Sequence, residues 1–224
     1  MTKIATDIAE NGWKHKTAYF IVRNLVTFVC RTWCRMTIEG AHHVPAEGVF
    51  ILAPTHRSII DTPIASGSTR RRMRFMGADK WWSNAALGGL LTVLGGFPVS
   101  RGTADREALR RAIELLESGQ PLVLFPEGER KSGPVVQPLF DGACYIAMKT
   151  GAPIVPVGIG GSERVMPKGA KFIYPRKVHV VIGEPVRVPT DGTPKEQRQA
   201  VRDTTEVLHA ELQRLFDRAE ARCA

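Results

Sequence analysis

The sequence lacks the features that define several common protein classes. Its four cysteines, Cys30, Cys34, Cys144 and Cys223, form no cluster with histidine at metal-ligand spacing, so we predict no metal site and expect free thiols. No G-x-S-x-G occurs, so the nucleophile elbow of many hydrolases is missing. Aromatic residues make up only 7% of the chain, which argues against a stacking surface for nucleic acid.

Long apolar runs are also missing. The residues from Thr17 to Cys34 come nearest, but Arg23, Asn24 and Arg31 interrupt them, and a span needs about 20 apolar residues. The first 16 residues mix charges of both signs, so no signal peptide is predicted. A helix with aromatic residues on one side and arginines on the other favours a position in the membrane interface. An ordinary core helix is the alternative.

Acidic residues are outnumbered by basic ones, 22 to 31, which gives a formal net charge of +9. This excess predicts attraction to an anionic partner, and both nucleic acid and an anionic lipid surface fit it. The charge alone does not choose between them.

What is present is the pattern of an α/β domain. Apolar runs bounded by proline and glycine predict five strands, and the two prolines of the fourth suggest an edge or irregular strand. Helices are expected at 105–117 and from the capping box at Thr193 onward. The fold class is therefore α/β, with a central, mostly parallel or mixed sheet flanked by helices. We assign 1–37 to an amphipathic, membrane-binding helical segment and 38–224 to a catalytic domain. The predicted strands are Val49–Ala53, Met73–Met76, Pro121–Phe125, Pro153–Ile159 and Lys177–Ile182.

The segment from Thr55 to Asp61 follows the first predicted strand, where α/β sheets often place ligands. A histidine such as His56 can act as a general base if a carboxylate holds its other ring nitrogen. Five residues on a helix separate two side chains by about 140°. For His56 and Asp61 to meet, the histidine must therefore lie on the turn that enters the helix. A capping threonine beside a hydrogen-bonded histidine is the alternative.

A second polar segment, Phe125-Pro126-Glu127-Gly128-Glu129-Arg130, follows another predicted strand. Glycine allows the backbone to approach a ligand closely, and arginine supplies donors that suit phosphate. A plain polar turn is the alternative for this segment alone.

Together the two segments resemble the glycerolipid acyltransferases, and most closely the 1-acyl-glycerol-3-phosphate acyltransferases. H-x4-D is followed by F-P-E-G-x-R after about seventy residues, and two further blocks agree in order. The resemblance covers about 38–184. The further blocks are Gly95–Arg101 and Ala152–Val157, and Gly77–Lys80 resembles the stretch that supplies a lysine near the acceptor phosphate.

The resemblance implies that His56, oriented by Asp61, deprotonates an acceptor hydroxyl as it attacks an acyl thioester. It implies that Lys80, Arg101 and Arg130 hold the acceptor phosphate. Glu127 would bond a glycerol hydroxyl or order its loop. Backbone amides near Glu127-Gly128 or at Val155–Val157 are candidates for the oxyanion hole. The run Ala85–Val99 would line the acyl chain or pack as a core helix and loop.

The same resemblance implies an acyl-CoA or acyl carrier protein donor, a lysophospholipid acceptor, no cofactor and no nucleic acid. The enzyme would work at the cytoplasmic face of the cell membrane. Glu129 departs from the family pattern, where a small hydroxyl residue is usual, so it should point away or pair with Lys131. A thioesterase, an acyltransferase for another lysolipid and a non-catalytic binding protein are the alternatives.

Overall fold

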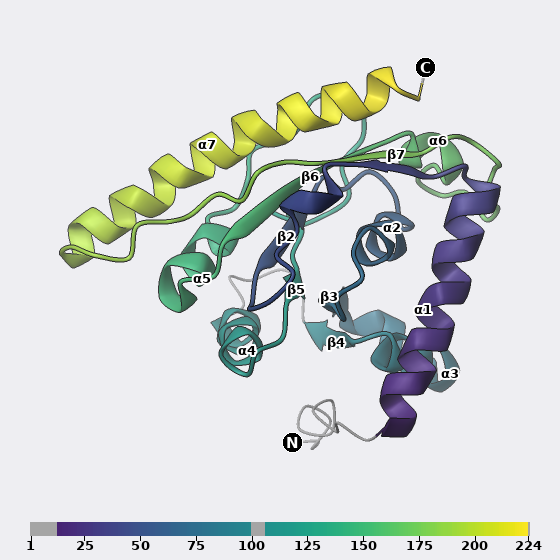
Figure 1. The fold of residues 1–224 in the computed structure, drawn as a ribbon, viewed down its shortest axis with the longest axis horizontal. Helices are drawn as coiled ribbons and strands as arrows, with labels where there is room; N and C mark the ends of the chain where they lie inside the picture. Colours follow the sequence, from purple (N-terminus) through teal and green to yellow (C-terminus); the bar gives the residue numbers. More distant parts are fainter. Residues whose placement is uncertain (1–12, 100–105, 224) are drawn as a thin grey trace.

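The computed structural model describes residues 13–99 and 106–223, and within them seven strands form one sheet (Figure 1). Across the sheet their order is β1-β7-β6-β2-β5-β3-β4. β6 and β7 pair antiparallel, whereas the other neighbouring strands pair parallel. The expected mixed α/β sheet is confirmed. The strands are β1 (Thr37–Glu39), β2 (Ile51–Pro54), β3 (Arg74–Ala78), β4 (Gly96–Val99), β5 (Leu122–Val123), β6 (Ile154–Gly160) and β7 (His179–Ile182).

Helices cover both faces of this sheet (Figure 1). Side chains alternate along a strand, so Ile51 of β2 packs in one hydrophobic core with α4, α5 and α7, while Leu52 packs in a second core with α1 and α2. The helices are α1 (Trp13–Trp33), α2 (Asp61–Gly67), α3 (Ala85–Val93), α4 (Arg106–Glu117), α5 (Gly142–Thr150), α6 (Ser162–Val165) and α7 (Pro194–Ala221), with 3-10 turns η2 (Ala41–His43) and η3 (Asp79–Trp82).

β6 lies inside the sheet, between β2 and β7, so the edge position suggested by its prolines is wrong. Pro156 lies one position beyond the last residue pair between β6 and β7. Its carbonyl accepts a hydrogen bond from Gly183 N. Because proline has no N–H to donate in return, the regular pairing of β6 with β7 ends beside it.

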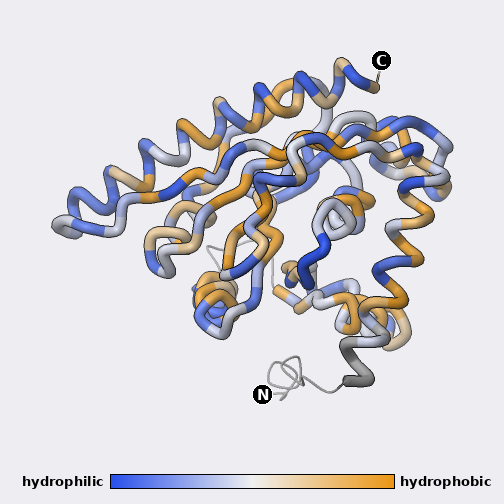
Figure 2. Tube along the Cα trace, in the orientation of Figure 1, coloured by the Kyte–Doolittle hydropathy of each residue, from blue (hydrophilic) through white to orange (hydrophobic). Residues whose placement is uncertain are grey.

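α1 packs against α2 and presents two different faces. Its inward face carries Tyr19, whose hydroxyl accepts a hydrogen bond from Met73 N, and Arg23, which donates to Thr69 O. Cys30 and Cys34 are buried on the same side, where burial raises the pKa of Cys30 to about 11. The outward face exposes large apolar side chains together with Asn24 and Arg31, and Figure 2 shows apolar and polar positions mixed along the helix. Its exposed large side chains are Phe20, Ile21, Leu25, Phe28, Val29 and Trp33.

Among the helices of the described residues, none combines the length and the apolarity that a bilayer span demands. The division of the chain at residue 37 stays a prediction.

α7 begins at the expected capping box, in which Thr193 and Glu196 exchange hydrogen bonds. The helix then crosses β6 at very close range, because Gly158 and Gly160 have no side chains. A Cβ on Gly158 would lie 2.3 Å from the carbonyl carbon of Leu215. This helix backbone cannot yield without moving α7 as a whole.

We therefore expect Gly158→Ala to lower the free energy of unfolding by about 3 kcal/mol, because the added methyl group clashes with backbone atoms that cannot move aside as a side chain can. Urea unfolding followed by circular dichroism measures it. Gly89→Ala is the matched control, because a Cβ there meets nothing within 4 Å and helix propensity favours alanine. Equal urea midpoints for the two variants would contradict the close packing of α7 on β6.

Candidate active site

His56 lies on the turn that connects β2 to α2, and Asp61 is the first residue of that helix. The His56 Nδ1 atom is 3.1 Å from Asp61 Oδ2, and the aspartate is fully buried. The residues between the two form bends and turns instead of a helix, so the five-residue spacing does not separate them as it would on a regular helix. The pairing predicted from the sequence is present, with the histidine outside the helix.

The Asp61 carboxylate also organises the turn. Its Oδ2 atom accepts hydrogen bonds from the backbone amides of Arg57 and Ser58, each at 2.6 Å. The His56 ring stacks on the ring of Phe125, which follows the neighbouring strand β5, with the ring centroids 4.0 Å apart. Because one nitrogen faces Asp61 and one ring face is covered, the imidazole is held in a single orientation, with Nε2 as the remaining basic atom.

Glu127 is buried and lies behind His56, and it does not line the pocket that opens beside that histidine. Its carboxylate accepts from His56 N at 3.0 Å and from Gln137 N at 3.1 Å, and both its oxygens accept from the Arg57 guanidinium at 2.8–2.9 Å. Hydrogen-bond donors of the protein itself therefore bind both carboxylate oxygens of Glu127. Of the two roles expected from the sequence, this geometry favours loop ordering.

Arg57 is the functional residue that sequence reasoning missed. Besides Glu127, its guanidinium donates to the carbonyl oxygens of Gly133 and Val135 and lies over the Phe216 ring. It was detectable in principle, since an arginine beside His56 and a glutamate in the second polar segment both follow strands that pair. Residues at the ends of paired parallel strands meet at one edge of a sheet.

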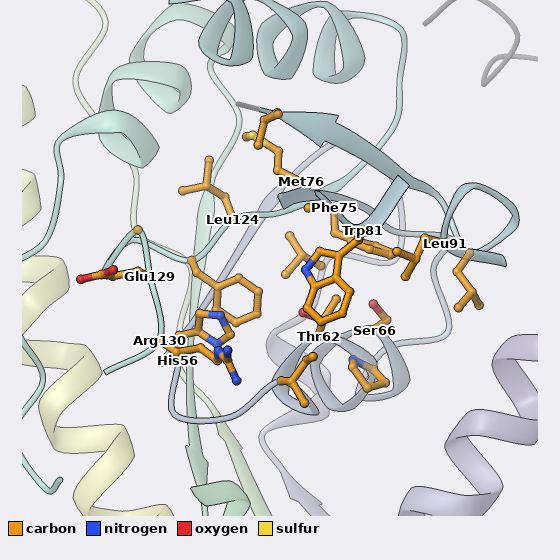
Figure 3. Close-up of a pocket in the computed structure, with 18 of the residues that line it drawn as sticks. His56, Thr62, Ser66, Phe75, Met76, Trp81, Leu91, Leu124, Glu129 and Arg130 are labelled. Atoms are coloured by element: carbon orange, nitrogen blue, oxygen red, sulfur yellow. The ribbon is translucent and has the colours of Figure 1, made fainter. Parts of the chain in front are cut away.

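A pocket of about 1180 Å³ opens beside His56 (Figure 3). Its walls come mainly from α1, α2, β3, α3 and the segment 124–131 that follows β5. Within α3 only Gly88 is buried, and Leu87 and Leu91 line the pocket, while Leu91 also packs against the second core, so both interpretations of this run hold in part. β4, which was not predicted, supplies Val99. The walls are largely apolar and include Val26, Met76, Leu87, Leu91, Leu109 and Leu124.

Basic residues line the same pocket. They are Arg23, Lys80, Arg130 and Lys131, and Figure 3 draws Arg130 toward the same end of the pocket as His56. Glu129 forms an ion pair with Lys131 at 2.9 Å, and its carboxylate points away from His56, as its unusual position in the motif required. Arg101, the other expected phosphate ligand, lies outside the described residues.

The two backbone candidates for the oxyanion hole fare differently. Val155–Val157 is fully buried in β6, paired with β2 and away from the pocket, so that candidate is wrong. Gly128 does line the pocket, with a φ of 72° and a missing Cβ that would lie 2.6 Å from the Phe140 ring. Its amide, however, donates to Phe125 O and closes the turn. Glycine is required at this position by both its φ and its space.

Comparison with known proteins shows the class to which this fold belongs. Residues 35–160 match the acyltransferase family, which is more than half of the chain. The chain belongs to this family, as the sequence motifs indicated.

Several relatives carry a more specific name. The 1-acyl-sn-glycerol-3-phosphate acyltransferase of Bacillus subtilis is 27% identical over 186 residues, which cover 82% of this chain and 89% of that protein. A chloroplastic enzyme of the same name from Brassica napus, BAT2, is 26% identical over 78% of this chain, but the match spans only 52% of its own length. The crystal structure of the 1-acyl-sn-glycerophosphate (LPA) acyltransferase PlsC from Thermotoga maritima superposes with a TM-score of 0.71 at 27% identity, covering 92% of this chain and 84% of that one.

The two glutamates of the second polar segment allow a matched test of the buried pair. We expect Glu127→Gln to lower the free energy of unfolding by about 3 kcal/mol, since it leaves the Arg57 charge buried and turns an amide NH2 toward backbone donors. Glu129→Gln changes a side chain that is 66% exposed and should stay within about 0.5 kcal/mol of wild type. Chemical denaturation measures both, and similar losses in the two variants would contradict the role given to Glu127.

Proposed function

We propose that this enzyme transfers a fatty acyl group from an acyl thioester to the free hydroxyl of lysophosphatidic acid or a closely related glycerol phosphate lipid. The observation that carries the proposal is the buried pair of His56 and Asp61 beside a large apolar pocket that is also lined by cations. The names of the relatives support the acceptor class.

In the proposed reaction the acceptor hydroxyl lies at His56 Nε2 and attacks the thioester carbonyl. The hydroxyl proton passes to the imidazole, whose positive charge Asp61 stabilises across the 3.1 Å contact. When the tetrahedral intermediate collapses, the carbon–sulfur bond breaks and the leaving sulfur takes the proton from His56. The ester is formed in one displacement on the carbonyl, and no acyl-enzyme is needed.

Lys80 and Arg130 are proposed to hold the acceptor phosphate, since both line the pocket. Arg101 stays a predicted third ligand. A phosphate held by such cations fixes the position of the hydroxyl relative to His56, which lowers the entropic cost of reaching the transition state.

The apolar walls are proposed to receive acyl chains. The pocket volume of about 1180 Å³ exceeds the range of roughly 300–1,000 Å³ that is usual for sites of single small ligands. Two substrates with long hydrocarbon tails meet in this reaction, and a site of this size and apolarity suits them.

We also propose that α1 lies in the interface of an anionic membrane, at its cytoplasmic face. The outward stripe of α1 exposes six large apolar side chains, whereas an ordinary surface helix turns its polar residues to solvent. The net charge of +9 favours the anionic leaflet. The donor is proposed to be acyl-CoA or acyl carrier protein.

Release of free thiol from palmitoyl-CoA, measured with and without lysophosphatidic acid in detergent, tests the reaction. We expect release that depends on the acceptor and falls about a thousandfold in His56→Ala, because the general base is lost. Retention of the wild-type urea midpoint shows that the variant is folded. Release that needs no acceptor would favour a thioesterase, and an active, folded His56→Ala would remove the general-base role. If palmitoyl-CoA gives no release, palmitoyl acyl carrier protein replaces it as donor.

The phosphate site is tested with two acceptors. Arg130→Ala should raise the apparent KM for lysophosphatidic acid by about tenfold while leaving the KM for monoacylglycerol, which has no phosphate, unchanged. Lys149→Ala removes an exposed cation outside the pocket and should alter neither value. An equal rise for both acceptors would assign Arg130 a structural role.

A further inference from the structure

The segment between α6 and β7 exposes three consecutive apolar side chains. Phe172, Ile173 and Tyr174 are 73%, 45% and 46% exposed. Lys171 precedes them and Arg176 and Lys177 follow, all exposed. From 166 to 177 the sequence has four basic residues and no acidic one. A protruding apolar tip within a ring of cations is unusual on a solvent-facing loop.

The loop is not a frayed end, because its backbone is bonded to its surroundings. Tyr174 N donates to Val165 O at 2.8 Å, and Arg176 N donates to Tyr174 O at 2.8 Å. The indole Nε1 of Trp33, at the end of α1, donates to Ile173 O at 3.0 Å. The three apolar side chains are therefore held outward by a fixed backbone.

Sheet topology places this loop beside the apolar stripe of α1. α1 runs into β1, and the loop runs into β7, and these two strands are parallel neighbours with Thr37 opposite His179. The segments that precede them must emerge side by side, as Figure 1 shows near the end of α1. Trp33 belongs to the exposed stripe of α1 and contacts the loop, so the two apolar surfaces are continuous.

The loop also lies at the end of the sheet that holds the active site. β7 runs antiparallel to β6, and β6 is parallel to β2, so the beginning of β7 lies toward the carboxyl end of β2, where His56 follows. The start of the segment between α6 and β7 contacts the turn that carries His56, because Ser58 Oγ donates to Met166 O at 2.8 Å.

We propose that the loop 171–177 is a second membrane-docking element, which inserts Phe172, Ile173 and Tyr174 into an anionic phospholipid surface beside α1. The choice of partner rests on the proposed function, since the acceptor is a membrane lipid. The observations favour a bilayer because apolar and aromatic tips suit the interface, while the flanking lysines and arginine suit anionic headgroups. Together the helix and the loop orient the active-site end of the sheet relative to the membrane.

Flotation with vesicles of phosphatidylcholine, with or without phosphatidylglycerol, tests the proposal on the full chain. Phe172→Ser should weaken binding to the mixed vesicles by about tenfold, since one large apolar contact is lost while α1 remains. Val207→Ser is the matched control, because Val207 is 58% exposed on α7, away from the loop. The pair Lys171→Ser and Lys177→Ser should weaken binding only when phosphatidylglycerol is present, and less as salt rises.

Activity separates this proposal from the proposed reaction. Phe172→Ser should keep wild-type turnover with acceptor dispersed in detergent and lose it with acceptor in vesicles. Equal vesicle binding by Phe172→Ser and wild type, or an equal loss in Val207→Ser, would overturn the docking role. A change of oligomeric state with unchanged vesicle binding would instead assign the surface to a second copy of the chain. Failure of turnover with every acceptor would sink the proposed reaction and leave the flotation result standing.

Discussion

The Glu127 carboxylate holds the active site together. It follows β5, yet it binds the backbone of His56 and the guanidinium of Arg57, which follow β2. Because β2 and β5 pair in parallel, their exits lie side by side, and one buried carboxylate fixes both loops at once. The position of the His56 ring relative to Phe125 and Arg130 depends on this tie. A buried ion pair contributes little net stability by itself, but removing one partner leaves a costly charge, so the arrangement is specific.

The two faces of α1 have different surroundings. The inward face of α1 carries Tyr19, Arg23 and Thr27, which line the pocket, whereas the outward face exposes large apolar side chains. A substrate pocket and a surface suited to lipid thus lie on opposite sides of a single helix. The parallel pairing of β1 and β7 adds the loop 171–177 to the same surface.

Much of the site was predictable because its interacting residues lie close together in the sequence. The His56 and Asp61 pair follows from one five-residue spacing, and the Glu129–Lys131 contact follows from a charge that had to be neutralised near the predicted phosphate site. Arg57 was not found because its partner lies seventy positions away (127 − 57), and only the strand order brings the two together.

The longer elements of the fold were also predictable from local signals in the sequence. Long periodic elements such as α7 carry their own signals in the chain, including the capping box at Thr193. β1 and β4 were missed: β1 has only three residues, and β4 lies within the run Ala85–Val99, which the sequence led us to assign to an acyl-chain wall or a core helix and loop. β4 also contains Pro98, which an edge strand tolerates, and β6 contains Pro156 although it is interior, so proline alone misplaced β6.

The central claim is that His56 and Asp61 act as one unit in acyl transfer. The most direct test is the kcat/KM of His56→Ala, Asp61→Asn and the double variant, measured with the same donor and acceptor. If Asp61 works through the imidazole, the double variant will be no slower than His56→Ala alone, because the aspartate has nothing left to orient. If the two losses multiply, the residues contribute independently, and the general-base account of this site is wrong.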